Sequence, residues 1–240
     1  MRALSVEPTT GMERTGGAGG ARIKLAAFDM DGVLIDHVSS WAAVHDALGT
    51  GNREAMAEFL EGRIDDREFI RRDVEVWRKA RPTLSQGDIV AILAKVPRMP
   101  GLREAITALR AQGTACVIVT GGLRAMGEML ALEGPFDGLR ANNVAFGPDG
   151  RLLDEAVVEV PIRAKGDVVR ALQLEYGVSR EETAAIGDTQ FDRGMFKESR
   201  VAVAFNPADE AVVRAATHVV REKDLRRAVA PLLDGMTHER

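Results

Sequence analysis

Short apolar runs that alternate with helical patterns constrain the fold of this 240-residue chain most strongly. Such short runs are typical of strands that are buried on both faces of a sheet. The four runs are Ile23–Phe28, Ala115–Val119, Thr183–Ile186 and Val201–Phe205. Helical patterns lie between or after them at Leu102–Ala111, Met126–Glu133, Val168–Tyr176 and Glu210–Ala216. Strands that alternate with helices predict an α/β fold with a Rossmann-like parallel sheet covered by helices on both faces.

The alternation stops between residues 37 and 97, where helical patterns replace the strands. We expect four helices there, at Ser39–Leu48, Arg53–Leu60, Asp65–Ala80 and Gln86–Lys95. Pro82 ends the third of them, because proline cannot continue a helix, and Pro97 marks the return to the α/β pattern. The sequence therefore predicts a helical cap domain over residues 37–97, inserted into a core made of residues 21–36 and 98–240.

Two smaller features complete the predicted organisation. The turn sequence Gly147–Gly150 separates residues 144–146 from residues 151–153, which predicts a small antiparallel β flap attached to the main sheet. Residues 1–20 are rich in glycine and predict a flexible N-terminal extension. These glycines precede the first strand, whereas a dinucleotide-binding glycine loop follows a strand, so we do not expect a Rossmann cofactor site.

Composition excludes several kinds of partner. The formal net charge of −4 removes the electrostatic attraction on which nucleic-acid binding depends. No apolar run approaches the roughly 18 residues that a membrane span needs, and the N-terminus lacks the apolar stretch of a secretory signal. We therefore expect a cytoplasmic protein without nucleic-acid or membrane partners, while nothing in the sequence indicates the oligomeric state.

Polar side chains follow three of the predicted strands at the point where each strand ends. Asp29 and Asp31 follow the first strand, Thr120 follows the second, and Asp188 and Asp192 follow the third. Ligands of open α/β sheets bind beyond the carboxyl ends of the strands, so we expect these side chains to meet in one crevice. Clustered carboxylates repel one another unless a cation lies among them, and hard oxygen ligands suit Mg²⁺. The sequence therefore predicts a magnesium site.

The same crevice has the groups that a phosphoryl group requires. The hydroxyl of Thr120 and the backbone N–H groups of Gly121 and Gly122 are suitable hydrogen-bond donors, and Lys165 is a suitable cation. Any single aspartate here has an ordinary explanation as a turn residue or a helix cap. Together, the carboxylates, the hydroxyl and the lysine predict a small phosphate ester as the ligand.

Four short motifs contain most of these residues. They are Asp29–Leu34, Thr120–Gly122, Lys165 and Gly187–Asp192. Their order and residue types resemble those of the haloacid dehalogenase superfamily of phosphatases, and most closely its phosphoserine-phosphatase-like branch. The resemblance extends over residues 23–233. It implies a magnesium-dependent phosphomonoester hydrolase that works through an aspartyl-phosphate intermediate.

The resemblance also implies a role for each residue in the reaction. Asp29 would be the nucleophile that attacks phosphorus, and Asp31 would be the general acid and base. Thr120, Gly121 and Lys165 would bind the oxygens of the transferring phosphoryl group.

For the metal, the resemblance implies that Asp29, Asp188 and the backbone carbonyl of Asp31 coordinate Mg²⁺, and that Asp192 orients these ligands. The helical insertion over residues 37–97 would close over a small phosphorylated metabolite, such as a phosphoserine-like compound or a small polyol or sugar phosphate.

Two positions depart from the family pattern. Phe191 stands where the branch has an asparagine, and Val38 stands where the phosphoserine enzymes carry a glutamate that helps to recognise the amino acid. Because of the first departure, a phosphate-binding regulatory protein without turnover is an alternative function. A haloacid dehalogenase is a further alternative, although Asp31 argues against it because displacement of halide needs no proton donor.

The arginines of the insertion have two interpretations. Arg71 or Arg72 could contact an anionic substrate from above. Acidic residues are interleaved with them, however, and this pattern favours exposed ion pairs on helix faces.

Overall fold

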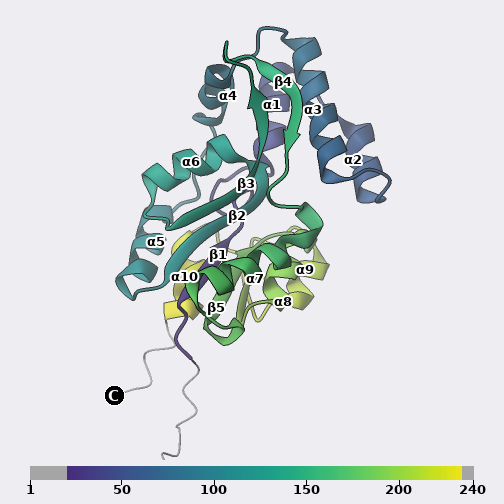
Figure 1. Cartoon of the computed structure of the whole chain (residues 1–240). Helices are drawn as coiled ribbons and strands as arrows, with labels where there is room; N and C mark the ends of the chain where they lie inside the picture. The colour runs from purple at the N-terminus through teal and green to yellow at the C-terminus, as the bar shows by residue number, and fades with distance from the viewer. Residues whose placement is uncertain (1–20, 234–240) are drawn as a thin grey trace, which may run out of the picture.

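A computed structural model of the chain describes residues 21–233 and contains a sheet of seven strands in the order β4-β3-β2-β1-β5-β6-β7 (Figure 1). The strands are β1 (Leu25–Phe28), β2 (Ala115–Leu123), β3 (Gly138–Phe146), β4 (Leu152–Val157), β5 (Thr183–Gly187), β6 (Val201–Phe205) and β7 (His218–Val220). Neighbouring strands are parallel, except that β3 and β4 are antiparallel. The predicted α/β fold is confirmed, whereas the predicted extension over residues 1–20 lies outside the described residues.

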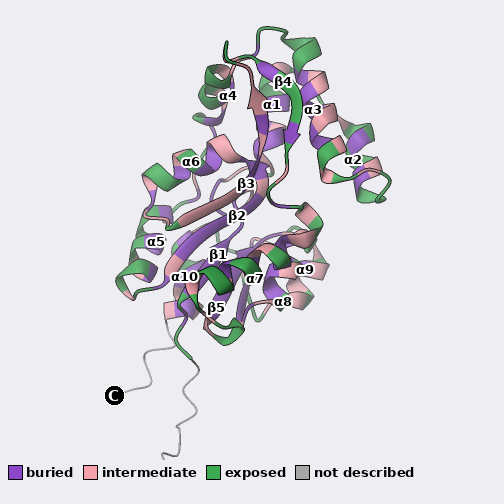
Figure 2. Ribbon diagram, viewed as in Figure 1, coloured by how far each residue is buried: buried purple, intermediate pink, exposed green. Residues whose placement is uncertain are grey.

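Helices cover both faces of the sheet, so the central strands are buried on both sides. In β1, Leu25 and Ala27 belong to one apolar cluster, whereas Ala26 and Phe28 belong to the other, as the alternation of side chains along a strand requires. The Phe28 face is covered by α5 (Leu102–Ala111), α6 (Arg124–Glu133) and α10 (Leu225–Leu233). The opposite face is covered by α7 (Lys165–Tyr176), α8 (Arg193–Lys197) and α9 (Glu210–Ala215). Figure 2 shows the buried sheet between these helices, which are exposed on their outer sides.

Four helices lie between β1 and α5. They are α1 (Ser40–Leu48), α2 (Arg53–Leu60), α3 (Asp66–Ala80) and α4 (Gln86–Leu93). Three of them begin at side-chain caps, because the side chains of Ser39, Asp65 and Ser85 accept hydrogen bonds from backbone N–H groups in the first turns. The four helices confirm the prediction, with small differences at the ends. None of the helices within residues 21–233 is long and apolar enough to span a bilayer.

The predicted flap is a β-hairpin whose first strand is also part of the main sheet. Residues 138–142 of β3 pair with β2, and residues 143–146 pair with β4. The hairpin lies beside the helical insertion: α3 packs against β4, and the N–H of Leu152 donates to the carbonyl of Leu84 just before α4 (Figure 1). The sequence indicated only the turn and its flanks, because the parallel half of β3 contains arginine and asparagine rather than an apolar run.

Strand β2 is longer than predicted. We expected it to end at Val119, but it continues to Leu123, with a register irregularity between Thr120 and Leu123. The segment Thr120–Gly122 is therefore the last part of a strand rather than a loop after it. Its two glycines interrupt the apolar pattern on which the prediction depended.

Candidate active site

Strands β2, β1 and β5 are neighbours in the sheet, so their carboxyl ends lie side by side. A cavity of about 670 Å³ opens at this edge and extends to the helical insertion. The site residues predicted from the sequence that line it are Asp29, Asp31, Thr120, Gly121, Lys165 and Asp188. Asp192 does not line the cavity; it is fully buried behind it. The structure therefore brings all seven predicted residues to one end of the sheet.

Lys165 links two of the carboxylates. It is the first residue of α7, and its Nζ lies 2.8 Å from Oδ1 of Asp29 and 2.7 Å from Oδ1 of Asp192. The next residue, Gly166, allows α7 to begin close to α8, because a Cβ there would lie 2.7 Å from the carbonyl oxygen of Gly194. Burial would lower the pKa of Lys165, but the two carboxylates outweigh burial and raise it. The lysine therefore carries a positive charge next to Asp29.

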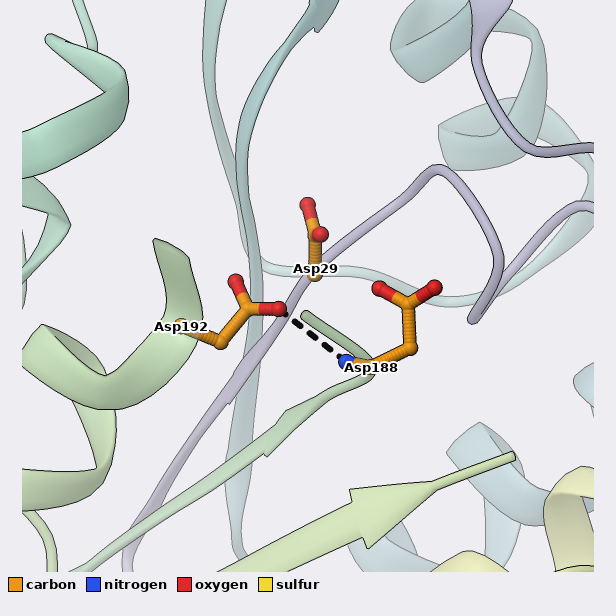
Figure 3. Close-up of side chains that lie close together, drawn as sticks. All are labelled: Asp29, Asp188 and Asp192. Carbon is orange, nitrogen blue, oxygen red and sulfur yellow. Dashed lines mark hydrogen bonds between the residues drawn. The ribbon is translucent and has the colours of Figure 1, made fainter. Parts of the chain in front are cut away.

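Asp192 holds the loop that carries Asp188. Its Oδ2 accepts hydrogen bonds from the backbone N–H groups of Asp188 and Thr189, both at 3.0 Å, and its Oδ1 accepts from Lys165. Figure 3 shows the first of these bonds and the three carboxyl groups of Asp29, Asp188 and Asp192 gathered at the ends of their elements. Both oxygens of Asp192 are thus already hydrogen-bonded, and the residue positions Lys165 and Asp188.

The carboxylates fit a metal ion. Asp29, Asp188 and Asp192 each present an oxygen such that all three atoms lie within 4.8 Å of one another. Oδ1 of Asp188 is buried without a hydrogen-bond partner, and burial together with the charges of Asp29 and Asp192 raises the pKa of Asp188 to about 9. Gly32, with a φ of +76°, leaves room beside it, since a Cβ there would lie 2.1 Å from Oδ2 of Asp188. Because both oxygens of Asp192 and Oδ1 of Asp29 are already engaged, the oxygens left for a cation are Oδ2 of Asp29 and those of Asp188.

Asp31 is held by a residue that sequence reasoning did not place in the site. The backbone N–H of Ser40 donates to Oδ1 of Asp31 at 2.9 Å, and the Ser40 hydroxyl donates to Oδ2 at 3.1 Å. The same hydroxyl accepts a hydrogen bond from the N–H of Leu123, which joins α1 to the end of β2. Burial, together with the charge of Asp29, raises the pKa of Asp31 to about 7. A carboxyl group with such a pKa can be protonated or ionised near neutral pH.

The Thr120–Gly122 segment is fixed from two sides. The carbonyl of Gly121 accepts hydrogen bonds from Nε1 of Trp41 at 3.0 Å and from Nδ2 of Asn142 at 3.3 Å. We expected the N–H of Gly122 to donate to a phosphoryl oxygen. In the structure it instead donates to Oγ1 of Thr120 at 2.9 Å, so it is not free. Glycine is needed here, because a Cβ on Gly122 would lie 2.7 Å from the side chains of both Asp31 and Ser40.

The two arginines considered as substrate contacts lie elsewhere. Arg71 and Arg72 both pair with Glu68, at 2.8 Å in each case, and neither lines the cavity. The expectation of ion pairs on a helix face is therefore confirmed. Arg53, which the sequence did not single out, does line the cavity, because it begins α2 at the cavity mouth.

Comparisons with known proteins agree with this geometry. The sequence model of the haloacid dehalogenase-like hydrolase family matches residues 26–197. Phosphoserine phosphatase of Wolinella succinogenes is 29% identical over 216 residues, which cover 88% of this chain and 100% of the relative. A probable phosphoserine phosphatase of Schizosaccharomyces pombe is 30% identical over 189 residues, which cover 76% of this chain and 61%, less than two thirds, of that relative.

A solved structure supports the fold. The phospho-aspartyl intermediate analogue of a phosphoserine phosphatase superposes with a TM-score of 0.73 at 22% sequence identity, and the match covers 86% of this chain and 97% of the other. The family match and the relatives confirm the resemblance that the four motifs carry. The chain therefore belongs to the haloacid dehalogenase-like hydrolase family.

Proposed function

We propose that the chain is a magnesium-dependent phosphatase that hydrolyses a small phosphate monoester through an aspartyl-phosphate on Asp29. One observation carries this proposal. Asp29, paired with Lys165, shares one cavity with Asp31, whose carboxyl group is held by Ser40, and with Asp188, whose buried oxygen has no partner. A nucleophile, a proton donor and a place for a cation thus surround one space.

The reaction has two displacements. An oxygen of Asp29 attacks phosphorus, the bond from phosphorus to the alcohol oxygen breaks, and the Asp31 carboxyl group donates its proton to the leaving alcohol. In the second displacement Asp31, now ionised, accepts a proton from water as the water attacks phosphorus, and the bond to Asp29 breaks. Lys165 and the Thr120 hydroxyl hold phosphoryl oxygens while their negative charge is redistributed.

The metal site would be formed by the carboxylates of Asp29 and Asp188 and the backbone carbonyl of Asp31. Bound Mg²⁺ supplies positive charge that offsets the repulsion between an anionic ester and the carboxylates. Asp192 keeps Asp188 and Lys165 in place through the hydrogen bonds described above. The orphaned oxygen of Asp188 and the room beside Gly32 support this assignment.

The division into cap and core is part of the proposal. Residues 37–97 would form the cap, and residues 21–36 and 98–240 the core. The cavity supports this division, because its walls come from α1, α2 and α3 as well as from the strand ends. A cavity enclosed in this way suits a small phosphorylated metabolite, among them phosphoserine-like compounds and small polyol or sugar phosphates.

Phosphate release tests the proposal directly. The protein is assayed with 4-nitrophenyl phosphate and a panel of metabolite phosphates, with Mg²⁺ or with a chelator, alongside the Asp29→Asn variant. We expect release that requires Mg²⁺ and disappears in the variant. Folded protein that binds Mg²⁺ and phosphate but releases none from any ester would instead support a regulatory module without turnover. Release of halide from haloacids in chelator would support a dehalogenase.

A further inference from the structure

The part of the cavity that faces the helical insertion is mainly apolar. The side chains that form this wall are Val38, Met56, Phe59, Phe69, Ile162 and Phe191. Val38 is 80% exposed and Met56 is 44% exposed, so both present apolar surface that nothing in the described chain covers. We call these six residues the apolar wall. Apolar surface at the inner side of a cavity favours an apolar occupant.

Several buried polar atoms beside the apolar wall are engaged with one another. Oδ1 of Asp73 lies 3.1 Å from Nε2 of His45 and accepts from Nδ2 of Asn52 at 2.9 Å. Nδ1 of His45 lies 2.9 Å from the Thr50 hydroxyl. The six side chains of the apolar wall themselves carry no group that could hydrogen-bond to an ammonium or carboxylate of a ligand.

One arginine lines the cavity among the described residues. Arg53 is exposed and makes no ion pair with any residue of the described range. An ion pair with a ligand carboxylate there would remain in water, where such pairs contribute little. Arg53 alone therefore gives weak selection for an amino-acid ester.

Phe191 extends the apolar wall down to the reacting carboxylates. It lies in the 3₁₀ helix η3 (Gln190–Asp192), and its ring centroid is 6.4 Å from that of Phe59. The guanidinium of Arg163 lies 5.1 Å from the Phe59 ring and 5.8 Å from the Phe191 ring. Nη2 of Arg163 also donates to the carbonyls of Phe59 and Leu60. The two rings are thus fixed before any ligand binds, which reduces the entropy lost on binding.

We propose that the alcohol part of the substrate is an uncharged alkyl or aromatic group, and that Met56 and Phe191 bind it, with the buried Phe59 ring packed behind them. This inference rests on the proposed phosphatase function for the other end of the substrate, where the phosphoryl group meets Asp29 and Lys165. It gives Phe191, one of the two residues that depart from the family pattern, a role in selecting the leaving group. Polar esters such as phosphoserine are then the poorer substrates.

Phosphonates test the apolar wall without requiring turnover. Benzylphosphonate and 2-amino-3-phosphonopropanoate both carry a non-hydrolysable phosphoryl group, and their Kd values are measured by calorimetry on the full chain with Mg²⁺. We expect benzylphosphonate to bind at least about tenfold more tightly, the discrimination typical of a small apolar contact. Equal or tighter binding of the amino-acid phosphonate, or undetectable binding of benzylphosphonate, would overturn the inference.

A matched pair of variants on α2 identifies the contact. Met56→Gln places a polar group of similar size on the wall, whereas Leu60→Gln makes a comparable change at a 48% exposed side chain that does not line the cavity. We expect Met56→Gln to weaken benzylphosphonate binding about fivefold to tenfold while binding of inorganic phosphate stays unchanged. Leu60→Gln should leave both unchanged. An equal effect of the two substitutions, or no effect of Met56→Gln, contradicts the proposal.

Turnover separates this inference from the proposed function. The values of kcat/KM are compared for 3-methylbutyl phosphate and O-phosphoserine, which are both esters of primary alcohols. Tight binding of benzylphosphonate without phosphate release from any ester refutes the phosphatase proposal and supports the apolar wall. Hydrolysis of O-phosphoserine at least as efficient as that of 3-methylbutyl phosphate refutes the apolar wall and leaves the phosphatase proposal in place.

Discussion

At the carboxyl ends of the strands the cavity is bounded by charged side chains that pair with one another, whereas the apolar wall bounds it on the side of the helical insertion. The sheet end combines a buried lysine with carboxylates, and the ion pairs and hydrogen bonds among them fix the geometry. The insertion end is fixed by packing, as in the contact of Phe59 with Phe69 and Phe191. The two parts of the cavity are therefore held together by different forces, and a substitution in one part should affect the other part less.

The largest effect is expected at the sheet end, from Asp29→Asn. The amide keeps the shape of the side chain but is a poor nucleophile, so turnover should fall by about 10⁴-fold or more while the fold is retained. Single-turnover phosphate release measures the loss, and circular dichroism checks the fold. Asp46→Asn, at the exposed cavity mouth, is the control and should keep most activity. A variant of Asp29 with wild-type turnover rules out the aspartyl-phosphate.

Removal of the buried cation should affect both stability and rate. Lys165→Gln leaves the carboxylates of Asp29 and Asp192 without their shared partner, which should cost about 3 kcal/mol of unfolding free energy and about 10²-fold in kcat. Urea denaturation gives the first value. Lys223→Gln removes an exposed lysine that pairs with Asp36, and it should cost less than about 1 kcal/mol. If both substitutions lower the unfolding free energy equally, the buried ion pairs of Lys165 are no more stabilising than the exposed pair of Lys223.

Magnesium should stabilise the sheet end specifically. Binding to the native state alone adds about 2.7 kcal/mol of stability when the free ion is at 100 times its Kd. We expect Mg²⁺ to raise the Tm of the wild type but not that of Asp188→Asn, which lacks the orphaned carboxylate oxygen. Without metal, the same variant should be at least as stable as the wild type, because carboxylate repulsion is reduced. Identical Mg²⁺ responses of the two proteins place the metal elsewhere.

Two adjacent serines at the start of α1 should have different effects, one on the reaction rate and the other on the stability of the fold. Ser40→Ala removes two hydrogen bonds of the serine hydroxyl, the one it donates to Asp31 and the one it accepts from the N–H of Leu123. This loss should lower kcat by about tenfold. Ser39→Ala removes the helix cap and should instead cost about 1 kcal/mol of stability. Steady-state kinetics and thermal unfolding on both variants test the distinction. A larger loss of kcat in Ser39→Ala than in Ser40→Ala reverses the assignment.

The smallest effect is expected from the arginine that pairs on the helix face. Arg71→Ala breaks an exposed pair with Glu68, so kcat/KM should stay within about twofold of the wild type. The measurement uses the best ester of the panel. A tenfold rise in KM would show that Arg71 contacts the substrate. Charged side chains would then bind the substrate at both ends of the cavity.

The proposed metal-binding end of the sheet was predictable from the sequence because two of its carboxylates directly follow apolar strands. Asp29 follows β1 and Asp188 follows β5, and the parallel pairing of these strands brings the two together. Lys165 was predicted from its motif and proved to be the first residue of a helix that covers the sheet.

Other features had no such signal. Ser40 looks like part of an ordinary helix start, and only the tertiary structure places its hydroxyl against Asp31. Asn142 belongs to the half of β3 that carries no apolar run, so its bond to the Gly121 carbonyl was not foreseen. The apolar wall was also missed, because its side chains come from α1, α2, α3, η1 (Ile162–Ala164) and η3 or lie beside them, and no local pattern relates them.

Strand β3 has a mechanical consequence, because it belongs to both the sheet and the hairpin that packs on α3. At the junction, Oδ1 of Asn142 accepts hydrogen bonds from the N–H groups of Glu159 and Val160, and its Nδ2 donates to the carbonyl of Val160. Nδ2 of Asn142 also donates to the carbonyl of Gly121. One side chain thus ties the hairpin strand to the segment that would hold the phosphoryl group, so the positions of these two parts are coupled.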